Sequence, residues 1–160
     1  MDLKQLYQDI ILEHGKSPRN LGKCEGYSHE AKGYNPLCGD KVHVYLKLDS
    51  GKKVEGLTFE GDGCAISLAS ASIMTESVKG KYFEEAKEII NAFLDMIKNT
   101  SELQSNHLDE DQKTKLMSLS GVKQFPMRVK CATLAWHTLV SAMKEKKEEV
   151  NTEDIDWWVI

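Results

Sequence analysis

Three of the four cysteines in this chain stand in short stretches whose residue types suit a metal or thiolate site. These are Cys38, Cys64 and Cys131, and a carboxylate, Asp40, lies two residues after the first of them. Three soft sulfur ligands and one hard oxygen ligand, taken from remote parts of a chain, are what a tetrahedral zinc or iron site needs when folding assembles it. The sequence therefore predicts a metal site made by these four side chains.

The chain as a whole has the composition of an ordinary globular protein. Its 160 residues suit a single domain, and 41% of them are hydrophobic. The net charge of -4 offers no broad basic surface, so we expect no nucleic-acid partner. No apolar run approaches the roughly 20 residues of a membrane span, and residues 1–12 lack a signal-peptide layout, so we expect a cytoplasmic protein with no membrane partner. Thiols stay reduced in that compartment, which favours metal binding or thiol chemistry over disulfides.

A predicted hairpin places two of the cysteines side by side. Apolar and polar residues alternate over residues 41–48, a turn follows at residues 49–52, and a second strand is expected over residues 54–60, with Gly56 at a possible bulge. An antiparallel hairpin brings the residues before its first strand and after its second to one edge of the sheet. We therefore expect Cys38 and Cys64 to be neighbours.

Cys64 is predicted to stand at the start of a helix. It follows the glycine-rich stretch 61–63 and opens a run of small residues, 65–72, which indicates a strand, a tight turn and a closely packed helix. The helix N-terminus would favour a thiolate and lower the pKa of the thiol. The alternative is a small buried cysteine that only fills the junction.

Cys131 is predicted near the start of a long helix running from Pro126 roughly to Lys147, on its inward face. Arg128 and Lys130 flank it and could hold a thiolate or a persulfide by charge, or could simply be two solvated charges. His137 lies about 240° around the helix from Cys131, so we interpret it as a surface or packing residue.

Two further interpretations concern the fourth ligand. Asp40 could instead cap a turn or a helix, although Gly39 lets it and Cys38 fold back toward one point. Cys24 has no glycine turn or helix start beside it, so we expect a non-catalytic thiol. It would replace Asp40 as a ligand if that carboxylate faced solvent.

The remaining elements are predicted from hydrophobic spacing and from glycine and proline positions. We expect a short edge strand near residues 27–32, and a polar surface insertion over residues 99–118. The expected helices are an opening one over residues 3–14, one over residues 82–98 and a short one over residues 109–117.

Residues 34–40, 61–67 and 128–131 read YNPLCGD, GDGCAIS and RVKC. In this order they resemble the three cysteine motifs of the NifU/IscU/SufU family of iron-sulfur cluster assembly proteins, and the likeness extends over about residues 3–147. The scaffold branch of that family typically has a histidine before the third cysteine. Lys130 at that position, together with the 99–118 insertion, makes this chain similar to the SufU type.

The resemblance implies an α+β fold, a single-domain α/β sandwich in which a small antiparallel three-stranded sheet packs on helices, with the metal site at one end. The domain would cover residues 1–150, followed by an apolar tail, residues 151–160. The resemblance carries over Cys38, Asp40, Cys64 and Cys131 as ligands of Zn2+, or of Fe2+ or a [2Fe-2S] cluster.

The same resemblance implies two related functions. In the first, the protein is a zinc-bound sulfur acceptor that takes persulfide sulfur from a SufS-type cysteine desulfurase and passes it to downstream cluster-assembly proteins. Cys38 would be the sulfur-accepting thiolate, because its glycine-flanked loop should move more easily than a helix. In the second, the protein is a scaffold on which a [2Fe-2S] cluster is assembled and transferred to apoproteins. A structural zinc module used only for protein contact is a third alternative.

The apolar finish of the tail, Trp157-Trp158-Val159-Ile160, lies outside the resemblance. We expect it to cover a groove of the core, or else to serve self-association or partner docking.

Overall fold

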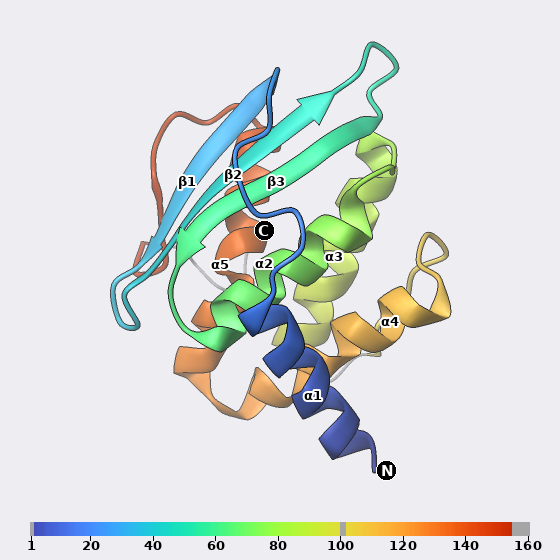
Figure 1. Ribbon diagram of the computed structural model, residues 1–160, viewed down its shortest axis with the longest axis vertical. Helices are drawn as coiled ribbons and strands as arrows, with labels where there is room; N and C mark the ends of the chain where they lie inside the picture. Colours follow the sequence, from blue (N-terminus) through green and yellow to red (C-terminus); the bar gives the residue numbers. More distant parts are fainter. Residues whose placement is uncertain (1, 100–101, 155–160) are drawn as a thin grey trace.

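A computed structural model describes residues 2–99 and 102–154 of the protein. A sheet forms one layer and helices cover one of its faces (Figure 1), which confirms the predicted α+β sandwich. None of the helices in the described part of the chain is both long and apolar enough to cross a membrane. The elements are α1 (Leu3–Lys16), β1 (His29–Asn35), β2 (Asp40–Leu48), β3 (Val54–Asp62), α2 (Ala65–Val78), α3 (Phe83–Lys98), α4 (Glu110–Met117), η1 (Ser118–Gln124), α5 (Pro126–Met143) and β4 (Val150–Asn151).

The predicted hairpin is confirmed as β2 and β3. Lys41 pairs with Asp62 at the end where the cysteine segments begin, and the alternation of β2 places Val42, Val44 and Leu46 in the core. The register shifts between Lys47 and Leu48, so that an extra residue of β3 lies beside Gly56, where a bulge was expected. The hairpin therefore fixes the relative position of the two segments that carry Cys38 and Cys64.

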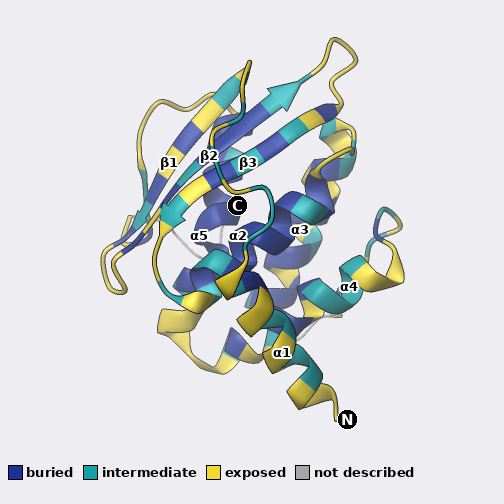
Figure 2. Ribbon diagram, viewed as in Figure 1, coloured by how far each residue is buried: buried dark blue, intermediate teal, exposed yellow. Residues whose placement is uncertain are grey.

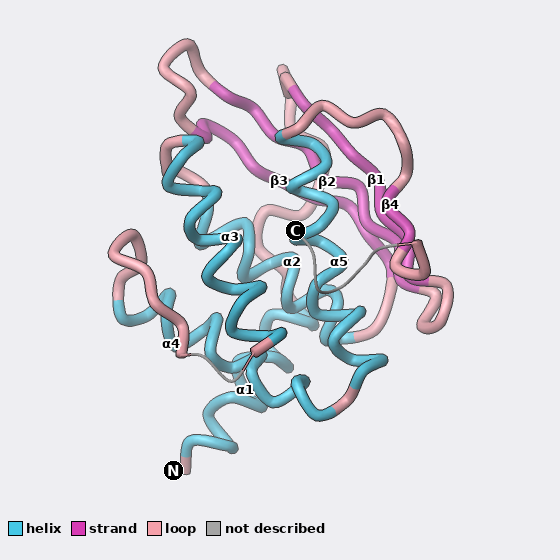
Figure 3. Tube along the Cα trace, turned by 180° about the vertical axis from the view of Figure 1, so that it is seen from behind, coloured by secondary structure: helices cyan, strands magenta, loops and turns pink. Residues whose placement is uncertain are grey.

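The prediction of three strands was wrong by one, because the described part of the sheet has four strands in the order β3-β2-β1-β4. Strand β4 is parallel to β1 and pairs Val150 with Gly33 and Asn151 with Tyr34 (Figure 3). Two residues are too few for an alternating pattern, so this strand left no signal in the sequence. The predicted domain boundary at residue 150 stays a prediction, although residues 150–152 are joined to the sheet and residues 155–160 lie outside the described part.

The core lies between the sheet and the helices α2 and α5 (Figure 2). Trp136 of α5 is fully buried and stacks on Phe93 of α3 with ring centroids 4.1 Å apart. Helix α5 ends at Met143, four residues before the predicted end, because Lys144 leaves helical geometry and Glu145 adopts a positive φ of 55°. The chain thereby turns back toward the sheet and β4.

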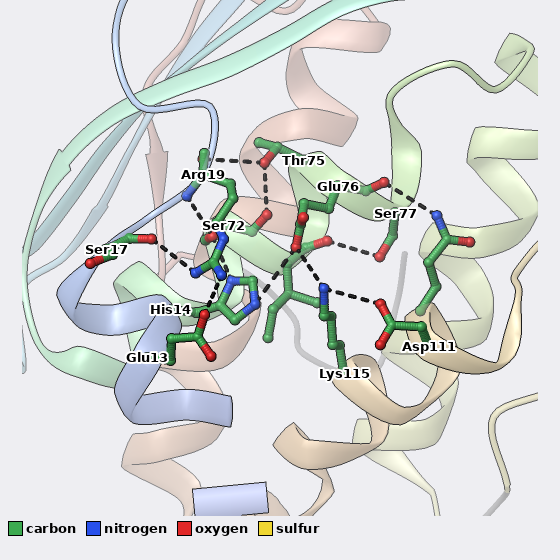
Figure 4. A network of polar contacts seen from close by, with 12 residues as sticks. Glu13, His14, Ser17, Arg19, Ser72, Thr75, Glu76, Ser77, Asp111 and Lys115 are labelled. Atoms are coloured by element: carbon green, nitrogen blue, oxygen red, sulfur yellow. Dashed lines mark hydrogen bonds and ion pairs between the residues drawn. The ribbon is translucent and has the colours of Figure 1, made fainter. Parts of the chain in front are cut away.

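A buried polar network fixes α1 against α2 and α4 (Figure 4). His14 Nδ1 and Ser72 Oγ are 2.7 Å apart, and Glu76 lies 3.6 Å from His14 Nε2 and 3.3 Å from Lys115 Nζ. Burial lowers the pKa of His14, with the charge of Arg19 adding to the effect. A largely neutral His14 thus joins the opening helix to the rest of the fold.

Most described residues of segment 99–118 are exposed or partly exposed, as expected for a surface insertion, but a few of its side chains reach the core. Its predicted short helix is confirmed as α4, but Leu116 is fully buried and Leu103 and Leu108 are 8% exposed. Lys115 and Asp111, in turn, join the network of His14 and Glu76. The predicted surface insertion is thus anchored to the core by isolated leucines, which gave no periodic signal in a polar stretch.

His137 is a packing residue, as expected, and it should make stability depend on pH. Burial lowers the pKa of His137 to about 4, and the charge of Lys98 acts in the same direction. The unfolded chain takes up this proton near pH 6.5, so the free energy of unfolding falls as pH drops from about 6.5 toward 4. Between pH 7 and pH 5, this proton should lower the free energy of unfolding of the wild-type chain by about 2 kcal/mol. We expect the His137→Gln chain not to show this decrease.

The measurement is urea denaturation of metal-free protein at both pH values, because metal release would add its own pH dependence. Equal pH slopes for the wild-type and His137→Gln chains would contradict the assignment.

Candidate metal centre

Three segments remote in sequence meet at one end of the sheet. The turn between β1 and β2 carries Cys38, the first residue of β2 is Asp40, and the second turn of α5 carries Cys131. One ligand atom from each of these residues lies within 4.8 Å of the others, and the two Sγ atoms are 3.2 Å apart. Cys38 is exposed, whereas Asp40 and Cys131 are buried. The centre is therefore closed on its protein side and open at Cys38.

Asp40 is held rigidly by two donors. Its Oδ1 accepts the backbone N–H of Cys64 at 2.9 Å, and its Oδ2 accepts Asn35 Nδ2 at 3.0 Å. The side chain is 0% exposed. A carboxylate without a water shell needs such donors or a cation beside it, so its position suits a ligand that is already oriented.

Cys64 is the N-cap of α2, as the sequence predicts, and its Sγ accepts the N–H of Ser67 at 3.5 Å. The pKa of Cys64 is lowered to about 7, first by a hydrogen bond from the Cys131 thiol and further by the backbone N–H groups of Ser67 and Ile66. Its sulfur lies outside the group of three atoms within 4.8 Å. The backbone N–H of Cys64, however, donates to Asp40 Oδ1 at 2.9 Å, which places this residue beside the centre.

Cys131 keeps its proton in the metal-free site. Its pKa is raised by the hydrogen bond to Cys64, by burial and by the hydrogen bond to Cys38. A metal ion would replace this shared proton, because thiolates are the metal-binding form of cysteine. Metal uptake should thus release a proton from the cysteine group.

Asn35 is a site residue that the sequence reasoning did not single out. Its Nδ2 donates to Asp40 Oδ2 and lies 3.5 Å from Cys131 Sγ, while its Oδ1 accepts the hydroxyl of Thr152 at 3.0 Å. Both Asn35 and Thr152 are 0% exposed. Asn35 stands in the first cysteine motif and pairs with Asp40 across the turn, which could have indicated it. Thr152, 117 residues away, gave no such signal.

The two cations that flank Cys131 in the sequence, Arg128 and Lys130, contact other side chains in the structure. Lys130 Nζ bonds the two carboxylate oxygens of Glu153 at 3.2 and 3.1 Å, and the Arg128 guanidinium lies over the Phe125 ring, 4.6 Å from its centroid. Lys130 directly precedes Cys131 in the chain, and Arg128 lies three residues before it. A role for them in holding a thiolate or persulfide stays a prediction.

Cys24 is not available as a replacement ligand. Its Sγ packs over Gly56, so that a Cβ added there would be 2.9 Å from it. Gly56 pairs with Lys47, seven residues along β2 from Asp40, and a strand rises about 3.3 Å per residue. Cys24 therefore lies at the opposite end of the hairpin from the centre. The expectation of a non-catalytic thiol fits this position, and the replacement role is excluded.

Gly63 should be indispensable to the centre. A Cβ at this position would lie 3.0 Å from Asp40 Cγ and 3.1 Å from its Cα, and the φ of Gly63 is 154°. An alanine would push Asp40 away from the Cys64 N–H. We expect Gly63→Ala to weaken metal binding about 10-fold or more, since outer partners of metal ligands have effects of this size.

A competition titration with a chromophoric chelator measures this loss of affinity. Gly121→Ala is the matched control, because a Cβ there meets nothing within 4 Å. Equal metal affinities for the two variants would contradict the role of Gly63.

The fold and the site together define an α+β protein with a cysteine and aspartate centre at one end of a mixed sheet. The NifU-like N terminal domain family matches residues 6–149. The chain belongs to this family.

Relatives of two kinds resemble the chain over most of its length. The zinc-dependent sulfurtransferase SufU of Bacillus subtilis is 40% identical over 146 residues, which are 91% of this chain and 95% of that protein. The iron-sulfur cluster assembly scaffold protein IscU of Streptococcus pyogenes is 36% identical over 152 residues, 95% of this chain and 91% of that protein.

Solved structures agree with the fold. A protein described as an iron-sulfur cluster assembly scaffold for the SUF system, from Fervidobacterium islandicum, is 36% identical and gives a TM-score of 0.72 over 87% of this chain and 97% of that one. A nitrogen-fixing NifU-like protein from Brucella abortus gives a TM-score of 0.75 at 23% identity over 89% of this chain and 95% of that one, which supports the fold alone.

Proposed function

We propose that this protein is a zinc-bound sulfur acceptor of the SufU type, which takes sulfur from a cysteine persulfide for iron-sulfur cluster assembly. The observation that carries the proposal is an exposed thiol, Cys38, set 3.2 Å from the buried sulfur of Cys131. The 40% identity to a zinc-dependent sulfurtransferase supports it. The same geometry would present one reactive sulfur to a partner while shielding the others.

The donor set of the centre fits Zn2+. Two sulfurs and the buried Asp40 carboxylate are already grouped, and Cys64 would complete four ligands by turning its Sγ from the Ser67 N–H toward them. A bound zinc ion would keep these thiols deprotonated and would stabilise the folded centre. Cys38, Asp40, Cys64 and Cys131 are the proposed ligands.

The proposed transfer is a displacement at sulfur. The Cys38 thiolate attacks the terminal sulfur of a persulfide on the donor protein, a new S–S bond forms on Cys38, and the S–S bond of the donor breaks. The donor cysteine leaves as a thiolate, so no external oxidant or reductant is needed. Cys38 suits this role because it lies in an exposed turn, whereas Cys131 is 2% exposed.

The surface around Cys38 suits a protein partner, for which we propose a cysteine desulfurase of the SufS type. Leu37 is 51% exposed beside Cys38, and Phe125 and Met127 at the start of α5 are 46% and 52% exposed. Exposed apolar side chains of this kind are typical of contact sites. Downstream cluster-assembly proteins would then receive the sulfur from Cys38.

Metal analysis of protein purified without oxygen tests this function. We expect about one zinc per chain and no acid-labile sulfide, together with transfer of 35S from a persulfide-loaded desulfurase. Iron with stoichiometric sulfide, and no transfer of labelled sulfur, would contradict the proposal.

A scaffold function is the second candidate, and the 36% identity to an IscU scaffold favours it. Three thiolates and a carboxylate can also hold the two irons of a [2Fe-2S] cluster. In that case anaerobic reconstitution with iron and sulfide should give a coloured protein that passes its cluster intact to an apoprotein.

A further inference from the structure

A groove with an apolar floor lies between the end of α3, the end of η1 and the start of α5, separate from the metal centre. It encloses about 470 Å3. Its apolar lining residues are Leu94 and Ile97, which are buried, Val129, which is partly exposed, and Pro126, which is exposed. Lys98, Lys123 and Lys130 also line it, and none of the described lining residues is acidic. The groove is thus apolar in depth and positive around its sides.

The last described part of the chain contacts a residue that lines this groove. Thr152 is buried beside β1, and Glu153 is bound by Lys130, which is also a lining residue of the groove. The ion pair therefore joins the end of the described chain to a residue that lines the groove.

The next six residues have the length and the chemistry to fill the groove. They read Ile155-Asp156-Trp157-Trp158-Val159-Ile160. A stretch of six residues can span about 20 Å, and each tryptophan can bury about 150–250 Å2. Asp156 complements the lysines that line the groove, and the apolar side chains complement its floor.

We propose that residues 155–160 bind in cis in this groove, with the Trp157-Trp158 pair on its apolar floor and Asp156 toward the lysines. The occupant of the groove is then the chain's own tail, beside the start of α5, the helix that carries Cys131. The proposal does not depend on the sulfur-acceptor function, because it rests only on the groove, the anchor at Glu153 and the tail sequence.

Photo-crosslinking of the full chain tests the occupant. A benzophenone amino acid replaces Trp158, and the crosslinked peptides are mapped by mass spectrometry after gel separation of monomer and dimer. We expect crosslinks within the monomer to residues 94–98 or 123–137. Crosslinks to another surface, crosslinks only in the dimer band, or no crosslinks at all would each overturn the proposal.

A matched pair of variants tests the groove itself. Val129→Asp places a carboxylate on the floor, whereas Met127→Asp alters an exposed side chain of the same helix that does not line the groove. The measurement is quenching of tryptophan fluorescence by acrylamide. The contribution of the two tail tryptophans is obtained by subtracting the signal of the same chain with Trp157→Phe and Trp158→Phe. We expect quenching to increase several-fold in Val129→Asp and not in Met127→Asp. Equal quenching in both, in chains with wild-type circular dichroism, would overturn the proposal.

Discussion

Cys131→Ser protein should purify almost without metal, and its affinity for Zn2+ should fall by about 100-fold or more. Cys131 is the buried sulfur that Cys38 Sγ approaches to 3.2 Å and Asn35 Nδ2 to 3.5 Å. Loss of an outer partner of a metal ligand typically costs about 10–100-fold in affinity, so loss of a central sulfur should cost at least the upper end of that range. Competition against a chelator of known affinity, with metal analysis of the purified protein, measures the change.

Cys24→Ser is the matched control for this experiment. It removes the same sulfur chemistry from the far end of the hairpin, where Cys24 packs over Gly56. We expect it to bind metal like the wild-type chain. If Cys131→Ser kept a full complement of tightly bound zinc, the centre would not be built around this sulfur.

Cys38→Ala should lose sulfur acceptance by about two orders of magnitude or more, because the attacking thiolate itself is removed. Among the three clustered site residues, Cys38 alone is exposed, so the buried Cys131 sulfur cannot take over its position without a shift of α5. The assay follows 35S from a persulfide-loaded cysteine desulfurase onto the chain, resolved on a non-reducing gel.

The control shows whether a loss of sulfur acceptance in Cys38→Ala results from a loss of folded structure. Cys24→Ala should accept sulfur at the wild-type rate, and circular dichroism should be unchanged for both variants. Undiminished labelling of Cys38→Ala would exclude Cys38 as the accepting thiol. It would favour Cys64 instead, whose pKa is lowered to about 7.

The sequence was sufficient to predict how two of the cysteine segments meet. Strict alternation over residues 41–48 defined one strand, a turn followed, and the glycines before Cys64 marked the passage into α2. These signals are local, because each depends only on the residue types within a short stretch of the chain. They placed the segments of Cys38 and Cys64 at one end of the sheet, but the Cys64 sulfur lies outside the group that Cys38 forms with Asp40 and Cys131.

Features that depend on distant contacts could not be predicted in this way. The two-residue strand β4 exists because α5 ends early and returns the chain to β1, and Thr152 reaches Asn35 only through that return. The burial of Leu116 and the pairing of Lys115 with Glu76 likewise depend on where α2 lies. Propensity and spacing carry no information on such contacts, which tertiary packing decides.

The distribution of the site along the chain has a consequence for biosynthesis. Cys131 lies 93 residues after Cys38 in the chain, and Thr152, whose hydroxyl donates to Asn35, follows 21 residues later. The proposed centre therefore cannot form on a nascent chain until α5 has emerged from the ribosome, and a shortened translation product that ends before this helix would lack Cys131.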